Sequence, residues 1–497
     1  MTTDAEMTTD ADTTAGIAVS TAQDVDRIFQ VQKASYSPAR PPTLAERLDR
    51  LERVEKMLQE NYTELVDALQ ADFGHRSRDQ IVGADIFAVM SHLPHIKRHL
   101  KKWVKPRRRS SGALGLAGVR SYVVNEPLGV VGVMSPFNAP VSLALDPAVE
   151  ALAAGNRVMV KPSELTPRTA GVLGRLVARY FDESELAVVS GGPDISAHFS
   201  ALPWDKFVFT GGTGVGRKIL AAAAPNLTPV ILELGGKCPA VVLPDADIAA
   251  VGAKVAQGRL GNGGQICLCV DYALVPEASL EAFLDAVIEK TVTDFPTVQG
   301  NPEVSAIIDR RSYDRVLGYV AEAREKGFRV VQPDRYRGET LDPETRQLPL
   351  TIVVDPDDRL AVHREEVFGP VLSVYTYRTL DQALDLVNAK EKPLALYVFG
   401  RNRRAIRRVV DETSSGGVSV NELSLHAMST SMGFGGVGPS GMGRYRGGRV
   451  GFEAFTNPKS VSVQSRLLAR FSGGLLPPFT TERQRTMLYR MARLPRG

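Results

Sequence analysis

The feature that most constrains the fold is an alternation of short β-branched runs with helical segments. Four runs follow one another in the first half of the chain, at residues 129–134, 157–161, 206–209 and 229–232. A helical segment, 169–180, lies between the second and the third. Strands that alternate with helices predict a parallel sheet with crossover helices, and therefore an α/β fold.

The alternation continues through most of the chain. A second alternating region extends from about residue 241 to residue 420, and the segment 459–464 alternates like an edge strand. With 497 residues, the chain also exceeds what one hydrophobic core usually organises. We therefore expect two or three domains.

Composition limits the kinds of partner. Hydrophobic residues make up 43% and charged residues 23%, as in ordinary soluble globular proteins. The net charge of +4 gives no reason to expect nucleic acid or an anionic membrane as the main partner. The basic stretch 101–109 lacks a surrounding nucleic-acid-binding motif, so we interpret it as a solvated loop. Since no run of about eighteen apolar residues occurs, we expect no transmembrane segment and a cytoplasmic location.

The three cysteines are Cys238, Cys267 and Cys269. An odd number spread over a long chain argues against a disulfide framework and fits a reducing compartment. None of them has the spacing of a zinc site, so we expect no metal. A disulfide between Cys267 and Cys269 is the weaker alternative to a structural role for Cys269.

The two ends of the chain differ from the middle. The composition of residues 1–20 predicts a disordered tail. After it, Thr43 and Glu46 form a capping-box pattern that predicts the start of an amphipathic helix. The extension 466–497 is basic, with spaced leucines and methionines. It could pack on a neighbouring subunit, or it could make weak peripheral contact with a membrane.

A glycine-rich turn lies at residues 207–216. It has the order strand, glycine turn, helix start, and it contains Gly211, Gly212 and Gly216. Glycines let a dinucleotide approach the backbone, and the N–H groups at a helix start suit phosphate. The spacing is not GxGxxG, however, so a purely structural turn is an equal alternative.

Three residue types point to chemistry at a carbonyl carbon. Glu233 precedes Leu-Gly-Gly-Lys, Cys267 follows Gly-Gly-Gln-Ile, and Asn138 follows the first predicted strand. A lone cysteine is more often an inert buried residue than a nucleophile. An Asn side chain, however, can donate a hydrogen bond to a developing oxyanion, and a carboxylate can act as a general base.

Taken with these residues, the chain resembles the aldehyde dehydrogenase superfamily over about residues 30–465. Seven segments match the family's motifs in the family's order, namely 136–138 (PFN), 161–164 (KPSE), 209–216 (FTGGTGVG), 233–237 (ELGGK), 264–267 (GQIC), 365–370 (EEVFGP) and 439–443 (PSGMG). Asp271-Tyr272 and the segments 420–426 and 475–479 resemble the branch of coniferyl-aldehyde dehydrogenases and dimeric aromatic or fatty aldehyde enzymes.

The resemblance implies oxidation of an aldehyde to a carboxylic acid through a cysteine thioester. In that scheme Cys267 attacks the carbonyl carbon, while the Asn138 amide and the Cys267 N–H hold the oxyanion. Glu233 then activates the water that releases the acid. Because the thiolate is the reactive form, we expect the surroundings of Cys267 to lower the pKa of its thiol.

The resemblance also implies a nicotinamide cofactor. It assigns Lys161 and Glu164 to the adenine ribose, Glu366 to the nicotinamide ribose and Phe368 to the ring region. A carboxylate at the ribose favours NAD, although NADP is possible. This chain departs from the family at Ile266, at Phe137 and at the segment 444–446, which puts the substrate in doubt rather than the reaction.

The family's architecture gives expected domain boundaries. A Rossmann-like NAD(P)-binding domain is expected over residues 21–119 and 126–240. An α/β catalytic domain is expected over 241–424. A small bridging sheet that makes a homodimer is expected over 120–125 and 425–465. Two other functions stay open: a CoA-acylating semialdehyde dehydrogenase on the same scaffold, and a non-catalytic scaffold protein.

Overall fold

The computed structural model describes residues 19–112, 115, 118–465 and 478–495. Most of the predicted disordered tail therefore lies outside the described residues. Of its last residues, Ser20 donates its N–H to the Ser190 carbonyl at 2.9 Å. Within the described ranges, no helix has the length and apolarity needed to cross a membrane.

The first α/β unit is built on a six-stranded sheet. Its strand order is β15-β7-β6-β3-β4-β5, and all neighbours are parallel except β15 and β7. The bounds are Gly441–Met442 for β15, Val230–Leu234 for β7, Lys206–Gly211 for β6, Val130–Met134 for β3, Arg157–Lys161 for β4 and Leu186–Val188 for β5. These bounds confirm the four runs from which the parallel sheet was predicted.

The second unit holds a seven-stranded sheet with the order β10-β11-β12-β9-β8-β13-β14. Only β10 runs antiparallel to its neighbour. The bounds are Val330–Val331, Thr351–Val354, Val371–Tyr377, Val270–Pro276, Cys238–Val242, Ala395–Phe399 and Gly417–Val420, in that order. The chain is thus an α/β protein with two parallel-rich sheets, as expected.

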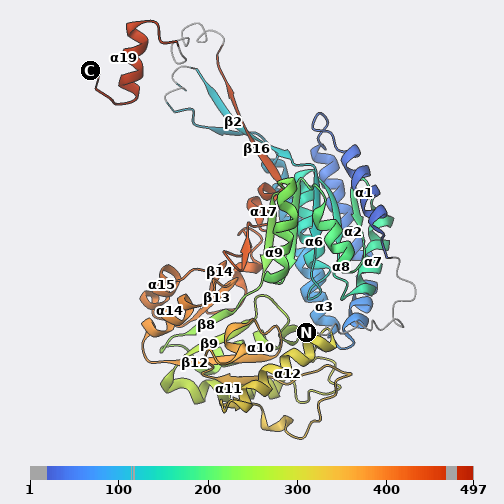
Figure 1. The fold of residues 1–497 in the computed structure, drawn as a ribbon, viewed down its shortest axis with the longest axis vertical. Coiled ribbons are helices and arrows are strands. Elements are labelled where there is room, and N and C mark those ends of the chain that lie inside the picture. Colours follow the sequence, from blue (N-terminus) through green and yellow to red (C-terminus); the bar gives the residue numbers. More distant parts are fainter. Residues whose placement is uncertain (1–18, 113–114, 116–117, 466–477, 496–497) are drawn as a thin grey trace, which may run out of the picture.

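A three-stranded antiparallel sheet projects from the body as an arm (Figure 1). It consists of β1 (Arg107–Arg109), β2 (Arg120–Pro127) and β16 (Thr456–Val463). The predicted edge strand 459–464 is confirmed by β16. The interpretation of residues 101–109 as a loop was wrong, because 101–103 end a helix and Arg107–Arg109 pair with β2.

The boundaries predicted for the three domains stay predictions. Within the segment 425–465, the structure places Thr456–Val463 in the arm, but Gly441–Met442 pairs with β7 at the edge of the six-stranded sheet. The end of the chain therefore contributes to two sheets.

Helices cover both sheets (Figure 1). The predicted capping box is present at Thr43, whose hydroxyl accepts the Glu46 N–H while the Glu46 carboxylate accepts the Thr43 N–H. The helices around the six-stranded sheet are α1 (Ala22–Ser35), α2 (Leu44–Phe73), α3 (Arg78–Ile81), α4 (Ala88–Trp103), α6 (Ser142–Ala154), α7 (Pro167–Tyr180), α8 (Pro193–Ala201), α9 (Thr213–Ala223) and α17 (Gly448–Ala454).

The second sheet has its own set of helices. They are α10 (Ile248–Leu260), α11 (Leu280–Asp294), α12 (Arg310–Glu325), α13 (Ala361–Arg364), α14 (Leu380–Ala389), α15 (Arg403–Glu412) and α16 (Leu425–Met428). A last helix, α19 (Glu482–Met491), lies beside the outer end of the arm and has no buried residue (Figure 1).

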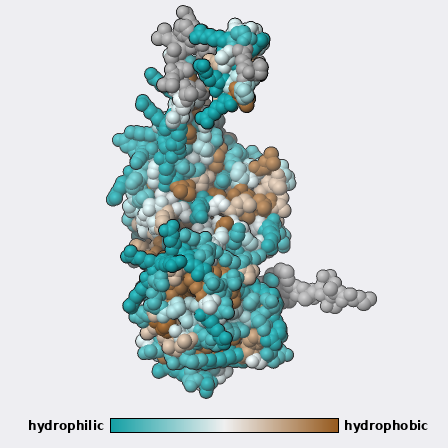
Figure 2. Space-filling view, turned by 90° about the vertical axis from the view of Figure 1, so that its left-hand side faces the viewer, coloured by the Kyte–Doolittle hydropathy of each residue, from teal (hydrophilic) through white to brown (hydrophobic). Residues whose placement is uncertain are grey.

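The core is made of apolar side chains, whereas the surface is mostly hydrophilic. Valine, leucine and alanine from α2, α6 and the strands β3 and β4 make the largest cluster, which reaches into the second unit. Figure 2 shows that the outer face is mostly hydrophilic, with hydrophobic side chains grouped in several places on the body below the arm. In an open parallel sheet, ligands bind outside the carboxyl ends of the strands, so the ends of β3, β4, β6 and β7 locate the site.

Candidate active site

One cleft lies at the carboxyl ends of β3, β4, β6 and β7 and encloses about 990 Å³ of solvent space. Its wall contains all but one of the residues predicted from sequence. These are Asn138, Lys161, Glu164, Gly211, Gly212, Glu233, Cys267, Glu366 and Phe368. The exception is Gly216, which lies inside α9, where a Cβ would overlap the side chain of Leu234 on β7. Gly216 therefore allows α9 to pack closely against β7, and its assignment to the cofactor stays a prediction.

The turn that presents Cys267 depends on two glycines. Gly263 and Gly264 have φ values of 61° and 79°, in the left-handed region that favours glycine. A Cβ on Gly264 would also overlap the carbonyl of Gly369, which follows Phe368. The turn before Cys267 (the nucleophile turn, after the role that the resemblance implies) is thus in backbone contact with the loop 365–370, which carries Glu366 and Phe368 (the cofactor loop, named in the same way). This contact explains why glycine occupies position 264.

Asn138 is tied to this turn by hydrogen bonds. Its Nδ2 donates to the Gln265 carbonyl at 3.1 Å, and its own carbonyl accepts the Asn262 Nδ2 at 3.1 Å. The Gln265 side chain binds the Asn262 and Ala306 carbonyls and the Ile308 N–H, each at 2.9 Å. Asn138 therefore lies beside Cys267 with one amide hydrogen committed and one left for a ligand.

Glu233 lies at the end of β7 and is 1% exposed. Neither carboxylate oxygen has a hydrogen-bond partner among the described residues. Burial raises the pKa of Glu233 to about 8, and the positive charges of Arg446 and Arg444 offset only part of that effect. A carboxyl group with a pKa near the working pH suits general-base chemistry.

The surroundings of Cys267 do not favour its thiolate. Burial raises the pKa of the Cys267 thiol well above its ordinary value, and the charges of Glu233 and Glu366 add to the rise. The expectation of a lowered pKa was wrong. The reason is that the charged groups acting on the sulfur are the carboxyl groups of Glu233 and Glu366, whereas a thiol pKa is lowered by a nearby positive charge.

The end of β4 forms one wall of the cleft. Lys161 is buried, and its Nζ donates to the Pro162 carbonyl at 3.0 Å and to Glu164 at 3.4 Å. Burial lowers the pKa of Lys161, and the Glu164 carboxylate counteracts this. Glu164 itself is exposed, so its carboxylate can accept a hydrogen bond from a ligand hydroxyl.

Glu366 and Phe368 lie on the opposite wall. The Glu366 carboxylate occupies the space that a Cβ at Gly235 would need, which explains the first glycine after Glu233-Leu. Burial, helped by the charge of Asp271, raises the pKa of Glu366 to about 7. Phe368 has a φ of 47°, a strained value for a bulky residue, and its ring lies 5.8 Å from that of Phe137 across the cleft.

A buried ionic network holds the loop that carries Glu366 and Phe368. Asp271 accepts the Val367 N–H at 3.1 Å and pairs with Lys237 and Arg259. Lys237 also donates to the Glu365 carbonyl at 2.8 Å. Burial alone would raise the pKa of Asp271, but the charges of Lys237 and Arg259 outweigh it and hold the pKa below its ordinary value.

The other two cysteines point away from the cleft. The Cys238 thiol donates to the Cys267 carbonyl at 3.3 Å, and the Cys269 thiol donates to the Gly258 carbonyl at 3.2 Å. Both are free and buried. The weaker alternative, a Cys267–Cys269 disulfide, is not formed in the structure.

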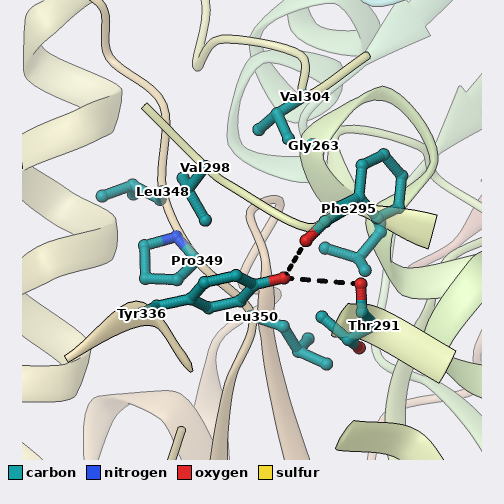
Figure 3. Close-up of a pocket in the computed structure, with 10 residues that line it drawn as sticks. Gly263, Thr291, Phe295, Val298, Val304, Tyr336, Leu348, Pro349 and Leu350 are labelled. Carbon is teal, nitrogen blue, oxygen red and sulfur yellow. Dashed lines mark hydrogen bonds between the residues drawn. The ribbon is translucent and has the colours of Figure 1, made fainter. Parts of the chain in front are cut away.

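A small void lies behind the nucleophile turn (Figure 3). It holds about 10 Å³, is lined by Gly263, Val298, Val304 and Leu348, and is closed by Tyr336, whose hydroxyl donates to the Phe295 and Thr291 carbonyls. A space of this size holds at most one water molecule, so it is a packing feature and no second ligand site. Among the described residues, no group of three His, Cys, Asp or Glu side chains could hold a metal ion.

Comparisons with known proteins agree with this geometry. A profile of the "Aldehyde dehydrogenase family" matches residues 3–461. The chain belongs to the aldehyde dehydrogenase family.

The most similar relatives of this aldehyde dehydrogenase include a coniferyl aldehyde dehydrogenase. That enzyme, from Pseudomonas sp. (strain HR199 / DSM 7063), is 44% identical over 433 residues, which cover 87% of this chain and 89% of the relative. The substrate-bound AldH of Staphylococcus aureus has a TM-score of 0.86 at 31% identity, covering 94% and 99% of the two chains. The Mycobacterium tuberculosis aldehyde dehydrogenase in complex with NAD+ has a TM-score of 0.80 at 29% identity, covering 90% and 91%. The fold and the NAD(P)-dependent oxidation of aldehydes follow from this membership.

Several residues of this aldehyde dehydrogenase site escaped the sequence analysis. Asn262 and Gln265 hold the nucleophile turn, and Asp271 with Lys237 holds the cofactor loop. Several of their hydrogen-bond partners are distant in the sequence, so a local sequence pattern does not predict these structural roles. Gln265, Lys237 and Asp271 did lie in matched segments, at 264–267, at 233–237 and in the Asp-Tyr pair after Cys267, but none of them was assigned a role.

We predict that Asp271→Asn lowers the free energy of unfolding of the aldehyde dehydrogenase by about 3–5 kcal/mol, because two buried cations lose their counter-charge. Urea unfolding would measure the change. The matched control is Asp314→Asn, whose exposed pair with Arg310 should contribute less than about 1 kcal/mol. Equal, small losses for the two variants would show that the network does not support the loop.

Proposed function

We propose that this chain oxidises an aromatic aldehyde of the coniferyl type to its carboxylic acid, with Cys267 as nucleophile, Asn138 as oxyanion donor and Glu233 as general base. The observation that carries the proposal is that one cleft contains the Cys267 thiol, the Asn138 amide and the buried carboxyl group of Glu233, whose oxygens have no hydrogen-bond partner in the described part of the chain. The 44% identity to a coniferyl aldehyde dehydrogenase supports the substrate class.

The proposed reaction has two stages. Cys267, as its thiolate, attacks the aldehyde carbon, and the free hydrogen of the Asn138 amide stabilises the negative oxygen. NAD+, when bound, would accept the hydride that leaves this carbon. Glu233 then takes a proton from water as the water attacks the thioester, which releases the acid and frees Cys267.

The described residues fit a dinucleotide of this kind. The cleft is large. At Gly212, just before α9, there is open space where a side chain would start, and the glycine at position 235 leaves room for the Glu366 carboxylate. We propose that Lys161 and Glu164 bind the adenine ribose and that Glu366 binds the nicotinamide ribose. The exposed Glu164 carboxylate favours NAD over NADP, because it would repel a 2′-phosphate.

We also propose a homodimer. Exposed apolar side chains are frequent between residues 410 and 450, where Val410, Val420, Leu425, Met428, Met432, Met442 and Val450 reach solvent. Apolar groups of this kind mark contact surfaces. The helix α19 adds exposed Met487, Leu488 and Met491 beside Arg483 and Arg490. We propose that α19 packs on the second subunit of the homodimer, and contact of this helix with a membrane surface is the alternative.

The free cysteines and the nucleophilic role proposed for Cys267 favour a reducing, cytoplasmic location.

The first test removes the nucleophile. We expect Cys267→Ala to abolish NADH formation with any aldehyde, because no thioester can form. The matched controls are Cys269→Ala and Cys238→Ala, which remove buried thiols that point away from the cleft and should keep most of the activity. Undiminished aldehyde oxidation by Cys267→Ala would exclude the assignment.

The second test uses pH. The carboxylate form of Glu233 exists above its pKa of about 8, so thioester hydrolysis should accelerate as pH rises from 6 to 9 and level off above that. Glu233→Gln should lose this rise and slow hydrolysis by about 10²–10⁴-fold. Intact-protein mass spectrometry should then detect an accumulated acyl group on Cys267. Rapid turnover without that adduct would exclude Glu233 as the base.

The third test identifies the substrate and separates the two remaining alternatives. We expect coniferyl aldehyde to give a higher kcat/KM than long-chain aliphatic aldehydes, with NAD preferred over NADP. Formation of NADH should not depend on CoA, since Glu233 is placed to activate water. A strict requirement for CoA would identify an acylating enzyme, and no turnover with any aldehyde would favour a non-catalytic protein.

A further inference from the structure

Two cations line the cleft that neither the reaction nor the cofactor assignment uses, Lys218 and Arg311. Arg311 lies in the first turn of α12, is exposed and lines the same cleft as Cys267, Glu366 and Phe368. No hydrogen bond or ion pair of its side chain occurs within the part of the chain that the structure describes. A solvated surface arginine is the ordinary explanation, so its position needs closer argument.

The inner face of α12 holds the loop that carries Glu366 and Phe368. Arg315 donates to the Val367 carbonyl at 2.8 Å, and Tyr319 donates to the Glu365 carboxylate at 2.8 Å. Arg311 precedes Arg315 by four residues, so the two side chains share one helix face. Arg311 therefore leaves α12 directly beside this loop and extends into the cleft.

The proposed cofactor would bring two negative charges into this space. With the nicotinamide ribose at Glu366 and the adenine ribose at Lys161 and Glu164, the pyrophosphate must lie between the two walls. Lys161 is already bonded to the Pro162 carbonyl and to Glu164. Lys218, on α9, lines the cleft beside α8, on the side of the six-stranded sheet. Arg311 is the cation that the second unit contributes.

We propose that Arg311 binds the pyrophosphate of the dinucleotide and so joins the two walls of the cleft through the cofactor. The inference rests on the proposed cofactor site. A guanidinium group suits this role because it can donate two parallel hydrogen bonds to phosphate oxygens. Its position on the rigid helix α12, instead of a loop, fixes where the phosphates lie relative to Phe368.

Equilibrium binding tests the proposal without turnover. NADH binding is followed by fluorescence, and ADP-ribose and adenosine are measured as competitors. Arg311→Gln should weaken NADH and ADP-ribose binding about ten-fold and leave adenosine unchanged, since a hydrogen bond to a charged group contributes about that factor. Arg311→Lys, which keeps the charge, should recover part of the loss. Raising the salt concentration should weaken binding less in Arg311→Gln than in the wild type.

The matched control is Arg310→Gln. Arg310 is the preceding residue, is also exposed, pairs with Asp314 at 2.9 Å and does not line the cleft. It should bind all three ligands as the wild type does. Unchanged ADP-ribose binding in Arg311→Gln, or an equal loss of adenosine binding, would overturn the role of Arg311. Failure of the wild type to bind NADH would instead contradict the cofactor site itself.

Discussion

The site depends on a pair of hydrogen bonds that cross between the two α/β units. Asn138 follows a strand of the six-stranded sheet, whereas Asn262 and Gln265 precede a strand of the seven-stranded sheet. The amide of Asn138 donates to the Gln265 carbonyl, and the Asn138 carbonyl accepts from Asn262. Because these bonds are buried, they are not exchanged with water. They hold the nucleophile turn of one unit beside the strand ends of the other.

The electrostatics of the cleft are unusual because burial favours neutral forms. Cys267, Glu233 and Glu366 all have a raised pKa, and the charges of the two glutamates add to the rise at Cys267. These surroundings favour the thiol form of Cys267 over the thiolate. In the proposed function, the positive charge of a bound oxidised nicotinamide would lower the pKa of this thiol.

Much of the fold and part of the site could be predicted from sequence. The strand runs, the helix start at Thr43 and the family followed from local patterns and from motifs in order. Cys267, Glu233 and Asn138 could be named because each lies in a short motif. The pKa of Cys267 could not be predicted, since it depends on Glu233 and Glu366, which lie far from it in the chain. For the same reason, the packing role of Gly216 against Leu234 appeared only when helix and strand were placed together.

The contact between Gly264 and the Gly369 carbonyl has a wider consequence. The turn at Gly264 and the loop at Gly369 touch through their backbones and leave no room for a side chain between them. A shift of one of them therefore requires a shift of the other. The turn that presents Cys267 and the loop that carries the residues assigned to the cofactor therefore form one rigid unit. If Cys267 is the nucleophile, variation in the accepted aldehyde is expected in side chains outside this unit.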